Sequence, residues 1–151
     1  MPCKEDMEEK KMFKKYGEYI FLANMLMIIA ATYLTITGLF FITAPADSNS
    51  PTYGRMLELM SFDAYGLFML VAATLLFVSS FQTGKLRHLS MLVGGILGAL
   101  ILGLYASAST QGAVNLMIPL RYSLIACTNL IIAAVGGIGL WRSRRLGSSQ
   151  D

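Results

Sequence analysis

Long apolar runs separated by short polar segments are the main feature of the chain. Residues 19–42 carry no charged side chain, and as a helix rising 1.5 Å per residue this run would reach about 36 Å, more than the roughly 30 Å hydrocarbon layer of a membrane. Three later runs cover residues 64–81, 89–108 and 122–141, and each has the length of about 17 to 25 residues that a spanning helix needs. The pattern predicts four transmembrane spans.

The spans are expected to be helical, because unpaired backbone groups cost several kcal/mol in lipid and a β-barrel would show shorter, alternating segments. We therefore predict an all-α integral membrane protein, folded as an antiparallel up-down-up-down bundle of four transmembrane helices. A charged tail of residues 1–18 precedes this domain of residues 19–141, and a basic tail of residues 142–151 follows it. Ala-Pro-Ala at 44–46 is similar to a signal-peptide cleavage site, but the first run exceeds the usual 7 to 15 residues, so we expect an uncleaved helix.

Composition supports a membrane environment, since 55% of the residues are hydrophobic and 14% are charged, against about 25% charged in ordinary soluble domains. The net charge of +3 is not gathered on one soluble face, because the basic residues flank the apolar runs, and we expect no nucleic-acid partner. Cys3, Cys127 and the single His88 form no disulfide or metal-binding pattern, and no P-loop or common hydrolase motif occurs. We expect no enzymatic activity and no cofactor.

The distribution of lysine and arginine predicts the orientation. The N-terminal tail holds five, the three connections hold one, two and one, and the C-terminal tail holds three, so ten of the twelve lie on one side of four spans. The positive-inside rule then places both termini in the cytoplasm, with the protein in the cell membrane. The charged tail itself is either a short interfacial helix or a solvated, mobile segment, and the second interpretation is preferred.

The connection of residues 43–63 is the longest of the three. Its first part is rich in turn-forming residues, and its second part mixes Met56, Leu57 and Leu59 with charged side chains. Two structures fit this pattern, an amphipathic helix at the outer surface or a second span that starts earlier and bends. The segment is either a surface for a partner or a packed connector.

Two charges lie at the expected outer ends of spans, Asp63 before the second and Arg121 before the fourth. In an antiparallel bundle they would lie at similar depth, as an ion pair or as coupling charges for ion movement. The preferred interpretation is simpler: Asp63 interacts with the positive end of a helix dipole, and Arg121 extends toward the lipid headgroups.

Small residues recur at helical spacing in the third and fourth spans, which is typical of closely packed membrane helices. Packing within the chain is preferred over self-association, and Asn24 and Asn129 are the strongest polar groups inside the spans. Three arginines directly after the fourth span are candidates for binding anionic lipid. The candidate packing residues are Gly94, Gly95, Gly98, Ala99, Gly103, Asn129, Ala133 and Gly137, and the candidate lipid-binding residues are Arg142, Arg144 and Arg145.

The leading hypothesis for function is a non-enzymatic bacterial or phage membrane protein that acts by helix packing or loop-mediated binding in a membrane assembly. Its partners would be the lipid bilayer and either further copies of the chain or another membrane protein. The alternative is a small oligomeric transporter, channel or holin-like pore. The small multidrug transporters are similar in span count only, because they use a carboxylate in the first helix and this first span has none.

Overall fold

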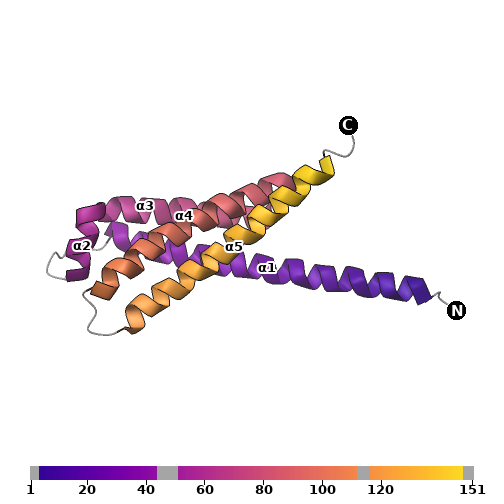
Figure 1. Ribbon diagram of the computed structural model, residues 1–151, viewed down its shortest axis with the longest axis horizontal. Coiled ribbons are helices and arrows are strands. Elements are labelled where there is room, and N and C mark those ends of the chain that lie inside the picture. The colour runs from indigo at the N-terminus through magenta and orange to yellow at the C-terminus, as the bar shows by residue number, and fades with distance from the viewer. Residues whose placement is uncertain (1–3, 44–50, 112–115, 148–151) are drawn as a thin grey trace.

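Helices and the short turns between them make up the described part of the chain. The computed structural model describes residues 4–43, 51–111 and 116–147, which form five α-helices (Figure 1). They are α1 (Lys4–Thr43), α2 (Pro51–Leu59), α3 (Phe62–Phe81), α4 (Gly84–Gln111) and α5 (Met117–Gly147). The predicted all-α class is confirmed.

Four of these helices contain segments long and apolar enough to cross a membrane, namely Ile20–Thr43, Phe62–Phe81, Gly84–Thr110 and Met117–Arg145. The number of such segments agrees with the four predicted runs. The last two are longer than predicted, because a helix continues through charged residues near its ends as long as their side chains can reach a polar region. This arrangement is consistent with a small multi-pass membrane protein.

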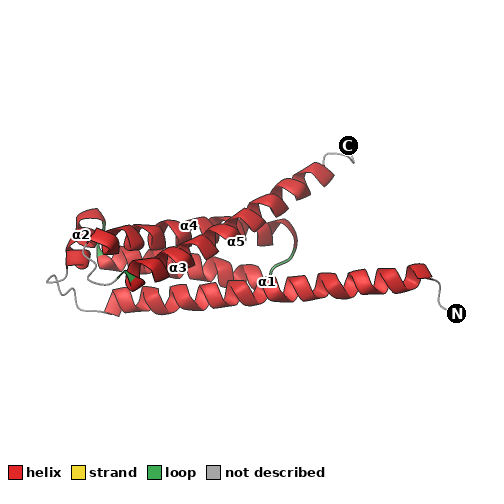
Figure 2. Cartoon of the chain, turned by 60° about the horizontal axis from the view of Figure 1, so that its bottom comes forward, coloured by secondary structure: helices red, strands yellow, loops and turns green. Residues whose placement is uncertain are grey.

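Helix α1 is longer than the first apolar run, since it begins at Lys4. The sequence favoured a solvated, mobile segment here, whereas the structure shows a helix continuous with the first span. Glutamate, lysine and methionine dominate this stretch and favour the helix, and no proline interrupts it. Figures 1 and 2 both show this end of α1 extending beyond the other helices.

A tight connection holds α3 and α4 together. Helix α3 ends before Gln82, whose backbone N–H donates to the Val78 carbonyl, and α4 begins two residues later at Gly84. Gly84 has a φ of +72°, a left-handed conformation that glycine adopts without steric cost. The start of α4 therefore lies beside the end of α3.

The long helices pack in the order α1, α3, α4, α5. Helix α1 contacts mainly α3, α3 contacts α4, and α4 makes its most extensive contact with α5, whereas α1 and α5 touch only slightly. In Figure 1, α1 and α5 cross and then diverge toward the two chain ends. The two outer helices therefore leave more of their apolar surface uncovered than α3 and α4 do.

An aromatic cluster fills the space between the helices near α2. The Phe41 ring lies 6.0 Å from Phe62, 6.2 Å from Tyr65 and 5.4 Å from Tyr105, and Tyr105 lies 4.2 Å from Tyr122, all between ring centres. These five residues come from all four long helices. We call this region the aromatic end of the bundle.

Helix α2 covers part of the aromatic end. Met56 is fully buried, whereas Leu57 and Leu59 are exposed, and the helix packs against α4. Residues Met60 and Ser61 separate α2 from α3, so the amphipathic-helix interpretation agrees with the structure and a bent extension of the second span does not. The predicted position of α2 at the outer membrane surface stays a prediction.

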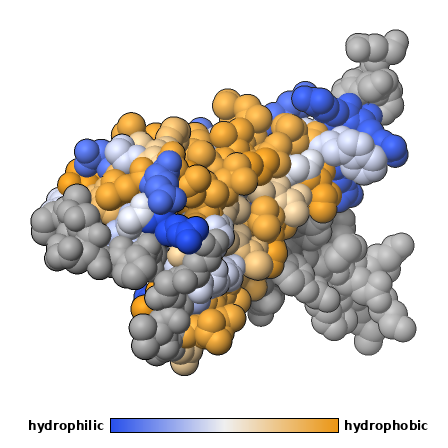
Figure 3. Space-filling view, turned by 60° about the vertical axis from the view of Figure 1, so that its left-hand side comes forward, coloured by the Kyte–Doolittle hydropathy of each residue, from blue (hydrophilic) through white to orange (hydrophobic). Residues whose placement is uncertain are grey.

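The outside of the bundle is strongly apolar. Figure 3 shows hydrophobic residues over most of the described surface on one face, with hydrophilic residues in smaller patches. Large apolar side chains such as Phe21 on α1 and Leu124 on α5 are 63% and 70% exposed. Contiguous exposure on this scale is rare for a soluble monomer and is ordinary for helices that face lipid.

Candidate functional site

The closest helix contact in the candidate packing surfaces lies between α4 and α5. A Cβ placed on Gly95 would lie 2.7 Å from the Asn129 carbonyl oxygen, 2.8 Å from the Ala133 nitrogen and 2.9 Å from the Ala133 Cβ. Two of these atoms belong to the backbone, so the two helices can approach this closely only because residue 95 has no side chain. All three residues are candidate packing residues from the sequence, and the structure brings them together.

Gly98 and Asn129 form the next contact along this surface. A Cβ at Gly98 would lie 2.9 Å from the Asn129 side-chain oxygen, and Asn129 is fully buried. Its Nδ2 donates to the Ile125 carbonyl at 2.9 Å, while its Oδ1 has no hydrogen-bond partner among the described residues. The amide therefore bonds within its own helix rather than across to α4.

The remaining small residues have different roles from one another. Gly94 faces α3, where a Cβ would lie 3.0 Å from Leu75 Cβ, and Gly103 has nothing within 4 Å of the same position. Ala99 is buried, and Gly137 has only an ordinary contact of 3.5 Å with Leu92. The predicted small residues therefore lie at two interfaces, α3–α4 and α4–α5, while Gly103 lies at an open position.

Two further glycines on α5, which the sequence did not single out, also lie against α4. A Cβ at Gly136 would lie 2.8 Å from both the His88 carbonyl oxygen and the Leu92 nitrogen, and one at Gly139 would overlap the His88 ring. The run Gly136, Gly137, Ile138, Gly139 is visible in the sequence, but the sequence does not show which glycine faces α4.

A second close contact that sequence analysis did not predict joins α1 and α3. A Cβ at Gly38 would lie 2.9 Å from the Gly66 carbonyl oxygen, and a Cβ at Gly66 would lie 2.6 Å from the Gly38 carbonyl oxygen. Each glycine is isolated within its apolar run, so the only sequence signal was a lone glycine in each of two spans. Glycines therefore support both the α1–α3 and the α4–α5 interfaces.

Asp63 and Arg121 form no ion pair in the part of the chain that the structure describes. Both side chains are exposed, and the Arg121 guanidinium carbon lies 5.9 Å from the centre of the Tyr33 ring. Asp63 lies in the first turn of α3, where a negative charge interacts favourably with the helix dipole. The position of Asp63 fits its helix-dipole interpretation, and the extension of Arg121 toward lipid headgroups stays a prediction.

The other end of the bundle carries most of the described basic side chains, and we call it the basic end. It comprises the start of α4 with Lys85 and Arg87 and the end of α5 with Arg142, Arg144 and Arg145. The guanidinium carbon of Arg145 lies 4.1 Å from the centre of the Trp141 ring. Of the three arginines predicted to bind lipid, Arg142 lines a cavity of about 630 Å³ between α1, α4 and α5.

Arg87 makes a polar contact between two helices at the basic end. Arg87 Nη2 donates to Asn24 Oδ1 at 2.7 Å, which joins α4 to α1. Asn24 is a strong polar group of the first span by sequence, but the sequence did not predict this partner. The two residues are 63 positions apart, so nothing local in the sequence pairs them.

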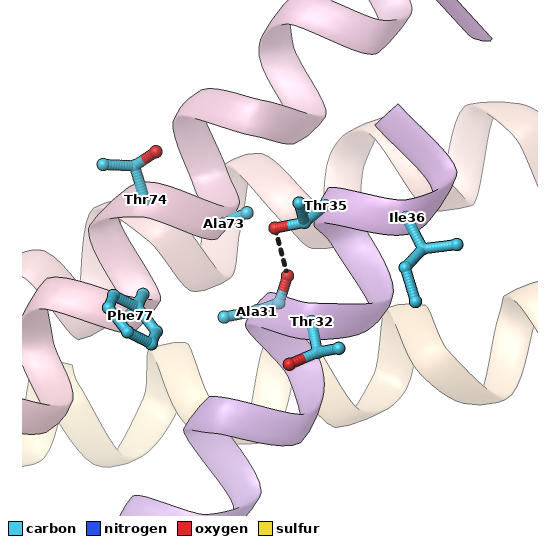
Figure 4. Close-up of a pocket in the computed structure, with 7 residues that line it drawn as sticks. All are labelled: Ala31, Thr32, Thr35, Ile36, Ala73, Thr74 and Phe77. Atoms are coloured by element: carbon cyan, nitrogen blue, oxygen red, sulfur yellow. Dashed lines mark hydrogen bonds between the residues drawn. The ribbon is translucent and has the colours of Figure 1, made fainter. Parts of the chain in front are cut away.

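A groove of about 300 Å³ lies between α1 and α3 at mid-length (Figure 4). Four of its seven lining residues belong to α1 and three to α3. Its threonine hydroxyls donate to carbonyls of their own helices, as Thr35 does to Ala31 at 2.9 Å and Thr74 to Leu70 at 2.8 Å. The groove is therefore mainly apolar. Its lining residues are Ala31, Thr32, Thr35, Ile36, Ala73, Thr74 and Phe77.

Comparison with known proteins identifies no relative. No protein-family model matches the chain, and no curated protein and no solved structure matches it either. The functional argument therefore depends on the residues and contacts of this chain.

Proposed function

We propose that the chain is a multi-pass protein of the cell membrane, with four antiparallel spans and both termini in the cytoplasm. Contacts between the ends of the helices support the alternating direction. Phe41 near the end of α1 packs on Phe62 at the start of α3, and His88 near the start of α4 packs on Gly139 near the end of α5. The basic residues at one end support a cytoplasmic location for that end, by the positive-inside rule.

We further propose that the protein acts without catalysis, as a packed helical component of a membrane assembly. The observation that carries this proposal is the character of the interior. The buried polar side chains of the described residues donate to carbonyls of their own helices, and Ser79 Oγ also donates to Met27 Sδ of α1 at 3.2 Å. These side chains are Ser79, Ser80, Ser109 and Asn129. The interior around them is apolar, and glycines bring the helix backbones into direct contact. Such an interior suits a rigid scaffold.

The exposed apolar faces of α1 and α5 provide the surface for this role. Helix α1 packs mainly against α3 and α5 mainly against α4, and the two outer helices hardly contact each other. Van der Waals packing and small residues drive helix association in lipid, so a partner helix competes with lipid for these faces. The partner is either a second copy of this chain or another membrane protein.

Chemical crosslinking in native membranes, followed by native mass measurement of the purified protein, tests the assembly role. We expect a defined oligomer or a reproducible complex with another membrane protein. The amount of this complex should rise and fall with the expression level of this chain. A strict monomer in both measurements, with no co-purifying protein, would contradict the proposal.

Flux measurements distinguish the assembly role from an oligomeric pore. Wild type and Asp63→Asn would be reconstituted in liposomes and compared for proton and ion release. We expect both to leave the liposomes sealed. Flux in wild type that the Asp63→Asn substitution abolishes would favour the pore and contradict a purely structural role.

Cysteine labelling tests the orientation. In a Cys127→Ser background Cys3 is the single site near one terminus. In a background with both Cys3→Ser and Cys127→Ser, the substitutions Ser149→Cys and Ser48→Cys each give a single site, near the other terminus and in the first connection. We expect an impermeant thiol reagent to label Ser48→Cys in intact cells, and Cys3 and Ser149→Cys only after the membrane is opened. Labelling of the two termini from opposite sides would exclude the proposed topology.

A further inference from the structure

The cavity at the basic end has the features of a binding site for an anion. Residues of α1, α4 and α5 line it, and α1 and α5 diverge toward their outer ends (Figure 1). Its volume of about 630 Å³ is within the roughly 300 to 1,000 Å³ of known ligand pockets. Three helices contribute to its wall. The wall carries positive charge from α4 and α5 and an apolar surface from α1 and α5, including Ile20, Val135 and Ile138.

Arg87 provides a fixed cation in this wall. Its hydrogen bond of 2.7 Å to Asn24 holds the guanidinium between α4 and α1, and the side chain is partly buried. An arginine has five N–H donors, and Asn24 accepts from one of them. None of the described residues that line the cavity is acidic, so no described carboxylate competes for the other donors. A planar guanidinium held in this way matches the oxygens of a phosphate group.

Arg142 adds a second positive charge from α5. Its side chain is exposed, and it makes no ion pair with any residue that the structure describes. Among the described side chains the acidic ones are Glu58 and Asp63, which belong to α2 and the first turn of α3, away from the basic end. Neither arginine of the cavity is therefore neutralised by a described carboxylate.

The start of α4 contributes to the same wall. Thr83 and Gly84 line the cavity, and the first N–H groups of a helix have no acceptor within the helix and carry partial positive charge. His88 also lines it, and its buried Nδ1 has no hydrogen-bond partner among the described residues. This atom packs against Gly139 of α5, so the contribution of this part of α4 to an anion site comes from its first N–H groups.

We propose that this cavity binds the phosphate group of an anionic phospholipid, with Arg87 and Arg142 contacting the phosphate and the acyl chains lying along the apolar wall of α1 and α5. A free phosphate ion shares the recognition chemistry, but it would gain nothing from Ile20, Val135 and Ile138. Basic pockets between membrane helices at the cytoplasmic side are a known arrangement for lipid headgroups. The site goes beyond general attraction of the basic end to an acidic membrane, because it depends on two particular arginines.

Native mass measurement of retained lipid tests the proposal on the full chain. The protein would be purified in detergent and exposed to mixed micelles in which phosphatidylglycerol is a small fraction and phosphatidylcholine the remainder. The paired substitution Arg87→Gln with Arg142→Gln removes two positive charges from the cavity. The matched control, Arg144→Gln with Arg145→Gln, removes two from the same end outside the cavity.

We expect wild type to retain phosphatidylglycerol in preference to phosphatidylcholine. The cavity pair should weaken this retention by at least about tenfold, because charge-assisted hydrogen bonds to the phosphate are lost, while the control pair should change it by less than about threefold. The proposal would be overturned if the two paired variants lost phosphatidylglycerol retention equally, or if the cavity pair lost none. Retention is measured on a single chain, so its failure would leave the assembly role untouched.

Two additions keep the test decisive. If the cavity pair does not fold, as judged by helix content and thermal unfolding, the exposed Arg142→Gln alone is compared with Arg144→Gln, and equal retention in the two would overturn the proposal. Excess inorganic phosphate is added to the wild-type complex. Persistence of the bound lipid supports the lipid assignment, and its complete displacement would show a site for the free ion and overturn that assignment.

Discussion

Gly95 offers the most direct test of the packing, because backbone atoms of α5 occupy the space that a side chain would need. In Gly95→Ala the new methyl group would lie 2.7 Å from the Asn129 carbonyl oxygen and 2.8 Å from the Ala133 nitrogen. Ordinary van der Waals contacts of a Cβ are 3.4 to 4 Å, so the two helices would have to separate by several tenths of an ångström. The control is Gly103→Ala on the same helix, where nothing lies within 4 Å.

The expected magnitude comes from two opposing effects. Overpacking a close contact costs about 1 to 3 kcal/mol, whereas replacing a helical glycine with alanine contributes about 0.8 to 1.0 kcal/mol of stability. In Gly103→Ala only the gain in helix propensity applies, so this substitution should raise the free energy of unfolding by about 1 kcal/mol. The helix-propensity gain is common to both variants. Gly95→Ala should therefore be less stable than Gly103→Ala by about 1 to 3 kcal/mol, which is the steric cost alone.

Reversible unfolding in mixed detergent micelles, followed by circular dichroism, measures both free energies under one condition. Equal stability of the two variants would refute the close approach of α4 and α5 at Gly95. A Gly103→Ala variant that is as destabilised as expected for Gly95→Ala would refute the open position at residue 103. Either result would show that the register between α4 and α5 differs from that in the structure.

Two further predictions concern the aromatic end. Met56→Ala should detach α2, because truncating a fully buried methionine costs about 2 to 5 kcal/mol, whereas Leu59→Ala, at a side chain 63% exposed, should change stability by less than about 0.5 kcal/mol. Amide exchange within α2 distinguishes these outcomes, and unchanged protection in Met56→Ala would contradict the docking of this helix. Tyr65→Phe should leave stability unchanged or raise it by about 1 kcal/mol, because the buried Tyr65 hydroxyl has no partner among the described residues. A clear loss of stability in the same unfolding assay would show that this hydroxyl makes a bond that the structure does not contain.

The candidate site was only partly predictable from the sequence. Gly95, Asn129 and Ala133 were identified by spacing, because small residues four positions apart share one helix face. Gly94 and Gly98 have the same spacing, yet they contact different helices. A step of four residues rotates a position by about 40°, which is enough at a crossing of three helices to change the neighbour. The sequence also identified Asn24 but not its bond to Arg87, because that contact depends on how far α4 is shifted along α1.

What the sequence determined by itself was the number of apolar helices and the positions of their flanking charges. Both are local properties: an uninterrupted apolar run of sufficient length becomes a helix when its backbone must bond internally, and a charge ends the run wherever it occurs. Tertiary structure alone decided which glycines meet, that α1 and α5 diverge, and that Arg87 and Arg142 line one cavity. Those features depend on crossing angles and on the register between helices, which arise from the fit of whole surfaces rather than from any one segment.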